Sequence, residues 1–128
     1  LLAVFALFFF AQSPEVATTI SFTEGPTVDS LGNLYFSDIP TNRILKLSPA
    51  GTLSTFRERS NGANGLLVDA EDRLLACEGA GAGIPRVTRT NLRTGALEVL
   101  AESDPDRPLQ APNDLSIDSR GRIYFTDL

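Results

Sequence analysis

The sequence NDLSIDSRGRIYFTD, residues 113–127, is the third copy of a repeat, and this repeat indicates the fold class. The earlier copies are EGPTVDSLGNLYFSD at residues 24–38 and NGLLVDAEDRLLACE at residues 64–78. All three align without gaps, and their starts, at 24, 64 and 113, lie 40 and 49 residues apart. A period of about 40 to 50 residues is typical of a β-propeller, in which each repeat forms one blade.

Each copy has the composition of a β-hairpin. A short apolar stretch leads to an Asp, at position 29, 69 or 118. A tight turn follows, and its left-handed position is filled by Gly32, Asp72 or Gly121, residue types that tolerate a positive φ. A second strand then ends in a carboxylate residue, which is Asp38, Glu78 or Asp127. Two apolar strands joined by such a turn predict an antiparallel pair.

The intervals between the copies predict two more strands each. Residues 43–48 alternate in polarity, turn at Pro49-Ala50-Gly51 and continue into residues 52–56, and the second interval repeats this at 86–91 and 96–100. Four short antiparallel strands make one propeller blade. We therefore predict an all-β fold, a partial β-propeller with about two and a half four-stranded blades over residues 20–128. A complete ring needs about four to eight blades.

The first residues differ from the rest of the chain. Leu1 to Ala11 is an unbroken apolar run, shorter than the roughly 20 residues that a membrane-spanning helix needs. We interpret residues 1–13 as a truncated signal peptide or apolar N-terminal segment, which predicts a periplasmic or secreted protein; a buried strand or the stump of a membrane anchor are the alternatives. Met is absent from the chain, position 1 included, which predicts a piece of a longer protein.

Composition excludes several functions. The 11 Lys and Arg residues against 16 Asp and Glu residues give a net charge of −5, so a nucleic acid is not an expected partner. The chain has no His, which rules out Ser-His-Asp and Cys-His catalysis and His-based zinc sites within it. Its one cysteine, Cys77, lies in the apolar run Leu74 to Cys77, which predicts a buried thiol.

The residues that open the copies are candidates for an ion site. They are Glu24, Asn64 and Asn113, and each carries a side-chain oxygen. The first strand of a propeller blade lines the central channel, so these oxygens are expected to converge on the axis. Oxygen donors in flexible geometry suit a hard cation such as Ca²⁺. The alternative is that the three side chains cap turns with the residues that follow them.

Several motifs in order resemble one family. They are FTEGP at residues 22–26, NGL at 64–66, ACEG at 76–79, PNDL at 112–115 and YFTD at 124–127. Together they make residues 20–128 similar to the N-terminal half of the SMP-30/gluconolactonase/LRE-like propellers. The resemblance implies a ring of six blades around one divalent cation, usually Ca²⁺, with Zn²⁺ or Mn²⁺ in some members.

The resemblance also implies roles for single residues. Glu24 would be a metal ligand, and Asn113 would contact the metal or the substrate. Asn64 would face the substrate channel. Asn113 and Asp114 are the candidate catalytic residues, and the alternative for Asp114 is a side chain that stabilises the turn. The further ligands, an Asn and an Asp, would come from later blades.

The function expected from this resemblance is metal-dependent hydrolysis of a lactone or a related ester, in which a cation polarises the carbonyl. The expected partner is a small-molecule lactone or ester, while the oligomeric state stays open. One alternative is a non-catalytic NHL-type propeller that binds a protein or a glycan. A second is a relative with the same ring and a different substrate. Two and a half blades alone are expected to be inactive and prone to aggregation, because unpaired strand edges stay exposed.

Overall fold

The computed structural model describes residues 20, 22–81 and 83–128, so the segment interpreted above as a signal peptide, residues 1–13, lies outside the described residues. The secondary structure described consists of β-strands, turns and bends. In that part of the chain there is no helix with the length and apolar character needed to cross a membrane.

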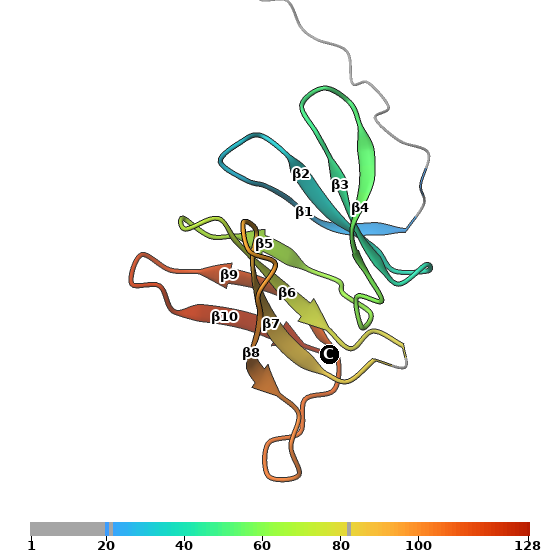
Figure 1. The fold of residues 1–128 in the computed structure, drawn as a ribbon. Coiled ribbons are helices and arrows are strands. Elements are labelled where there is room, and N and C mark those ends of the chain that lie inside the picture. Colours follow the sequence, from blue (N-terminus) through green and yellow to red (C-terminus); the bar gives the residue numbers. More distant parts are fainter. Residues whose placement is uncertain (1–19, 21, 82) are drawn as a thin grey trace, which may run out of the picture.

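The ten strands found in the described residues form three antiparallel sheets (Figure 1). The first sheet has the order β1-β2-β3-β4, with β1 Thr23–Val28, β2 Leu34–Asp38, β3 Arg43–Leu47 and β4 Leu53–Glu58. The second has the order β5-β6-β7-β8, with β5 Leu66–Val68, β6 Arg73–Glu78, β7 Arg86–Asn91 and β8 Leu97–Glu102. The third pairs β9 Pro112–Ile117 with β10 Ile123–Asp127. Two four-stranded blades and one hairpin confirm the predicted partial propeller.

The turn that joins the first two strands of each blade is built by its repeated Asp. Asp29 Oδ1 accepts hydrogen bonds from the backbone N–H groups of Leu31 and Asn33, at 3.0 and 2.8 Å. Asp69 and Asp118 accept the equivalent pair of backbone bonds in the second and third blades. The left-handed positions predicted from the sequence are also observed, with φ of 80° at Gly32, 53° at Asp72 and 76° at Gly121.

The core lies between neighbouring blades, and β6 contributes to it from both faces. Leu74 and Ala76 belong to a cluster that also contains Tyr35 and Ile44 of the first blade. Leu75 and Cys77 point to the opposite face, because side chains alternate along a strand, and pack in a second cluster with Leu115 of the third blade. Burial on both faces explains why this strand reads as an uninterrupted apolar run.

Cys77 is fully buried and forms no disulfide, as the sequence predicted. Fully burying a Leu side chain stabilises a fold by about 1.5 to 3 kcal/mol, so Leu74 and Leu75 anchor the middle blade to both neighbours.

Candidate functional site

The inner strands of the three blades lie side by side, and they meet closely at the ends where they begin. The backbone N–H of Gly65 donates to the carbonyl of Asn113 at 2.7 Å, which joins β5 to β9. The hydroxyl of Ser37 lies 2.8 Å from the carbonyl of Asn64 and 3.1 Å from that of Glu24, which joins the first two blades. The residues that open the three copies are therefore held within one small region.

Glycine follows the opening residue in the first two copies because neighbouring backbone leaves no room for a side chain. A Cβ on Gly25 would lie 2.3 Å from the backbone nitrogen of Leu66. A Cβ on Gly65 would lie 2.5 Å from the carbonyl oxygen of Asn113. The Glu-Gly and Asn-Gly dipeptides thus combine a polar side chain with the close packing of inner strands that a propeller axis requires.

A pocket of about 220 Å³ forms where these strands begin. Its lining residues are Glu24, Gly25, Pro26, Asn64, Gly65, Leu66, Asn113 and Asp114. All four residues singled out from the sequence therefore share one pocket, although they are spread over 91 positions of the chain, from 24 to 114 counted inclusively. Glu24 does not lie on the outer rim of the fold.

Three of the four side chains have no partner in the described part of the chain. Glu24 is exposed, Asn64 and Asn113 are half-buried, and none of their side chains forms a hydrogen bond or ion pair with a described residue. Their backbones, in contrast, are firmly held: the N–H of Asn64 donates to the carbonyl of Cys77 at 2.8 Å. Fixed backbones with unused oxygens leave these groups available to a ligand.

Asp114 is different, because the local chain uses its polar groups. Its Oδ1 accepts a hydrogen bond from the backbone N–H of Leu115 at 2.8 Å. Its own N–H donates to Thr126 Oγ1 at 3.1 Å, which ties β9 to β10. This carboxylate stabilises the start of β9 and still borders the pocket.

The donor set fits part of a calcium shell. Ca²⁺ takes about six to eight oxygen ligands, and carboxylate and amide oxygens are both common among them. One carboxylate and two amides provide such donors from three separate blades, with Glu24 in β1, Asn113 in β9 and Asn64 two residues before β5. The residues described include no group of three or more His, Cys, Asp or Glu side chains that could hold a metal, so a cation bound here would need the amide oxygens as donors beside Glu24.

Charge near the site is negative. Burial, together with the smaller effect of the carboxylates of Asp114, Glu78 and Asp127, raises the pKa of the Cys77 thiol to about 12. The thiol is therefore neutral at ordinary pH, and it acts as a packing group. Glu24 and Asp114 line the pocket and no Lys or Arg is among its described lining residues, so the local potential favours a cation over an anion.

Sequence reasoning missed Ser37, whose hydroxyl joins the first two blades at the site. It is fully buried, and it occupies the position held by Cys77 and Thr126 in the other copies. A small side chain before the final carboxylate of each copy was the available signal. The pattern marks the position where one blade meets the next.

Comparisons with known proteins identify relatives of this chain and of its fold. A family model described as the SMP-30/Gluconolactonase/LRE-like region matches residues 22–128. A gluconolactonase from Zymomonas mobilis subsp. mobilis is 28% identical, with 88% of this chain and 35% of the relative covered. The solved structure of a gluconolactonase from Xanthomonas campestris has a TM-score of 0.72 and 32% identity, covering 82% of this chain and 34% of that one.

A more distant structure shares the fold alone. The virginiamycin B lyase from Staphylococcus aureus has a TM-score of 0.65 at 19% identity, covering 88% of this chain and 37% of the lyase. The chain thus spans about a third of the length of the gluconolactonases it matches.

Proposed function

The chain belongs to the SMP-30/gluconolactonase/LRE-like family, and on that premise we propose that the whole protein hydrolyses a lactone or a related ester with a bound divalent cation. The similarity to gluconolactonases supports the lactone as the substrate class. Because this chain covers about a third of those relatives, the activity belongs to the complete protein, with residues 20–128 as the N-terminal part of its propeller.

One observation carries the proposal. Glu24, Asn64 and Asn113 come from three different blades, border one pocket of about 220 Å³, and keep their side-chain oxygens free of bonds to described residues. A turn-capping role, the alternative considered from the sequence, would tie those oxygens to nearby backbone N–H groups. Asp114 makes such a bond, and the other three side chains do not.

Each pocket residue has a distinct task in this proposal. Glu24 supplies the negative charge that holds the cation, which is Ca²⁺ or, alternatively, Zn²⁺ or Mn²⁺. When bound, the cation would supply Lewis-acid polarisation of the substrate carbonyl. Asn113 uses its amide to bind the metal or to orient the substrate oxygen, and Asn64 lines the path of the substrate. Asp114 keeps the start of β9 in place and thereby holds the direction of Asn113.

A signal peptide at the apolar residues 1–13 is compatible with the proposed activity. We propose that the enzyme acts in the periplasm or is secreted, with the propeller starting near residue 20.

The test uses the full-length protein, stripped of metal with EDTA and resupplied with Ca²⁺, Zn²⁺ or Mn²⁺, with glucono-δ-lactone as the probe. Glu24→Gln is expected to lower kcat/KM by about 100-fold or more and to weaken calcium binding measured by calorimetry, because the amide removes the anionic donor. Glu58→Gln is the matched control, since Glu58 is also exposed and its side chain has no hydrogen bond or ion pair within the described chain.

The outcomes separate the enzyme from a scaffold. Loss of activity in Glu24→Gln with retention in Glu58→Gln supports the proposal. Unchanged lactone hydrolysis in both variants, or a metal-stripped protein that stays fully active, would overturn it.

A further inference from the structure

The second strand of each blade ends in a carboxylate, and the proposed function gives these residues no task. They are Asp38, Glu78 and Asp127. In an antiparallel blade, the end of the second strand lies beside the start of the first, as the pairing of Asp38 with Thr23 demonstrates. These carboxylates therefore lie at the end of the blade where the pocket forms.

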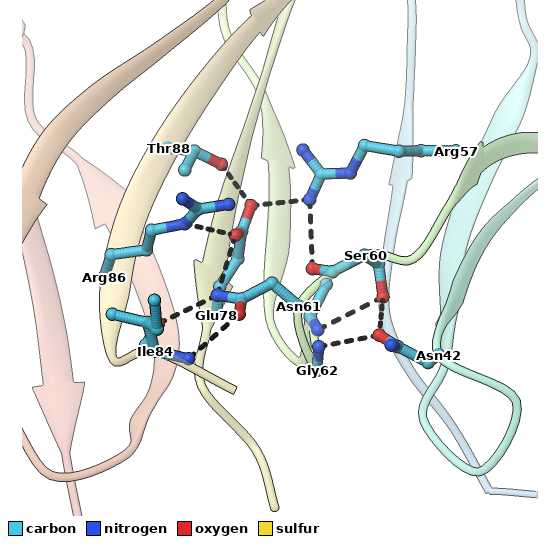
Figure 2. Close-up of polar contacts among 10 residues, drawn as sticks. Asn42, Arg57, Ser60, Asn61, Gly62, Glu78, Ile84, Arg86 and Thr88 are labelled. Carbon is cyan, nitrogen blue, oxygen red and sulfur yellow. Dashed lines mark hydrogen bonds and ion pairs between the residues drawn. The ribbon is translucent and has the colours of Figure 1, made fainter. Parts of the chain in front are cut away.

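Glu78 is fully buried and accepts hydrogen bonds from four side chains (Figure 2). Its Oε1 receives Arg57 Nη2 at 2.6 Å and Thr88 Oγ1 at 2.5 Å, and its Oε2 receives Arg86 Nε at 2.7 Å and Asn61 Nδ2 at 3.2 Å. A buried carboxylate needs such compensation to stay charged. The cluster joins β4 of the first blade to β6 and β7 of the second.

Through Asn61, this cluster reaches the segment that leads into the pocket. Asn61 comes three residues before Asn64. Its amide also pairs with the backbone of Ile84, donating to the carbonyl at 2.8 Å and accepting from the N–H at 2.9 Å. Its own carbonyl accepts from Gly79 N–H at 2.8 Å. Both the side chain and the backbone of Asn61 are thus fixed, which sets the path of the chain into Asn64.

Asp127 reaches the matching segment of the third blade by a different bond. Its Oδ1 accepts from the backbone N–H of Ala111 at 2.7 Å, and both of its oxygens lie 3.0 Å from the N–H of Gln110. These residues precede Asn113 by two and three positions. In both blades, the final carboxylate of the second strand holds the chain immediately before the amide that borders the pocket.

This contact is not a necessary result of the blade geometry. In the first blade, Asp38 bonds within its own hairpin, to Arg43 Nη2 at 2.9 Å and to the hydroxyl of Thr41. The same position can therefore be satisfied locally. The carboxylates that reach toward the preceding segment are the two whose blades open with a pocket asparagine.

We propose that Glu78 and Asp127 are positioning residues that set the direction of the Asn64 and Asn113 amides, an inference that rests on the proposed function of this pocket. Each acts at a distance of two or three residues, by fixing the backbone that precedes the asparagine. Neither carboxylate lines the pocket itself. Outer groups of this kind typically change activity or metal affinity by about 10- to 100-fold when they are removed.

The structure offers a matched control within a single hairpin. Asp118 also accepts two backbone N–H groups, from Arg120 and Arg122 at 2.9 Å each, at the opposite end of the β9–β10 pair. Asp127→Asn and Asp118→Asn, made in the full-length protein, are both expected to lower the urea midpoint. Only Asp127→Asn is expected to lower kcat/KM, by about tenfold or more.

A double-mutant cycle tests whether Asp127 acts through Asn113. Asn113→Ala and the double variant with Asp127→Asn are expected to have nearly equal kcat/KM, because the positioning effect disappears once the amide is gone. Losses that multiply, or equal kcat/KM in Asp127→Asn and Asp118→Asn, would overturn the inference.

A second readout does not depend on turnover. The NMR signal of the Asn113 side-chain amide, assigned with Asn113→Ala in calcium-free protein, is expected to shift in Asp127→Asn and to stay in place in Asp118→Asn. A wild-type protein without lactonase activity would defeat the proposed function, while this shift would still decide the inference. An Asn113 signal that stays in place in Asp127→Asn contradicts it.

The second blade needs a milder change, because Glu78→Gln would leave the partly buried Arg57 and Arg86 without their counterion and is expected to impair folding. Asn61→Gly removes the amide that links the cluster to the pocket segment and tolerates the observed φ of 59°. It is expected to shift the Asn64 side-chain signal. An unmoved Asn64 signal would remove Glu78 from the proposal.

Discussion

The two ends of the same hairpins carry equally regular polar residues but use them in opposite ways. At the turn end, Asp29, Asp69 and Asp118 recur in register, and each carboxylate is taken up by backbone and side-chain donors of its own turn. At the pocket end, Glu24 and Asn64 recur just as regularly, and their side chains bond to no described residue. A repeated polar residue identifies a position in the blade, and its hydrogen bonds identify its role.

Asp29 illustrates the turn end. Burial by itself raises the pKa of this carboxyl, but hydrogen bonds from Asn33, Tyr35 and the backbone of Leu31 outweigh burial and leave the pKa below its ordinary value. The turn therefore stabilises the ionised form of Asp29, and the carboxylate in return stabilises the turn. No cation is needed there, whereas the pocket end offers oxygens without such compensation.

One methyl group added at each end of the hairpins tests this comparison, and the largest effect is expected at the pocket end. Gly65→Ala places a Cβ 2.5 Å from the carbonyl oxygen of Asn113, so the inner strands must separate. We expect a loss of more than about 3 kcal/mol in the free energy of unfolding, because backbone packed against backbone cannot relax. Urea unfolding of the full-length protein measures the loss.

Gly121→Ala is the matched change at the turn end. Its φ of 76° is unfavourable for alanine, but the new Cβ would meet no atom within 4 Å. The expected loss is about 1 kcal/mol, the cost of a left-handed alanine. Equal losses in the two variants would mean that the inner strands do not converge as closely as the comparison requires.

Much of the turn end could be predicted from the sequence, because it depends on neighbours in the chain. The Asp, the glycine position and the alternating strands lie within 15 residues of one another, and the structure confirms the hairpin in each copy. The shared pocket of Glu24, Asn64 and Asn113 could also be predicted, since equivalent positions of a propeller meet at its axis.

The contacts between blades could not be predicted in the same way. Ser37 reaches Asn64 across 27 positions, and Arg57 reaches Glu78 across 21. A repeat specifies which residues are equivalent, but the partner that each finds across a blade interface depends on loop paths. The three final carboxylates are equivalent in sequence, but their partners differ: side chains of the same hairpin for Asp38, two partly buried arginines for Glu78, and backbone N–H groups for Asp127.

A smaller effect is expected from Asp29→Ala, which removes the acceptor for two backbone N–H groups, the Asn33 amide and the Tyr35 hydroxyl. The free energy of unfolding should fall by about 2 to 3 kcal/mol, because buried donors lose a charged partner. The kcat/KM of the folded enzyme should be unchanged, since Asp29 lies at the end remote from the pocket. A loss of activity without a loss of stability would show that Asp29 affects the reaction, and the two ends of the hairpin would then not differ in role.

The pH dependence of the Asp29 effect has a defined sign. The folded pKa of Asp29 lies below its ordinary value, so the contribution of the carboxylate is complete above the unfolded pKa and is lost as pH falls through the folded pKa. The difference in stability between wild type and Asp29→Ala should therefore narrow as the pH falls below about 4, the ordinary pKa of an unfolded Asp. A difference that is constant over this range would show that the ionised form is not what the turn requires.

The smallest effect is expected from Cys77→Ala. This variant tests whether residues at the pocket end differ in role when their side chains point into the core and not into the pocket. The backbone of Cys77 lies beside Asn64 and Gly65, which line the pocket. Its thiol is buried among Leu75, Val87 and Leu115. Burial first and nearby carboxylates second raise the pKa of this thiol to about 12. Removing the sulfur leaves a small cavity and should cost about 1 kcal/mol. Lactone hydrolysis and calcium affinity should match wild type, because the backbone bonds of Cys77 to Asn64 and Gly65 persist in alanine. A larger loss of activity than the lost stability explains would show that the thiol takes part in the reaction. The role of a residue would then depend on its position along the blade and not on whether its side chain is buried.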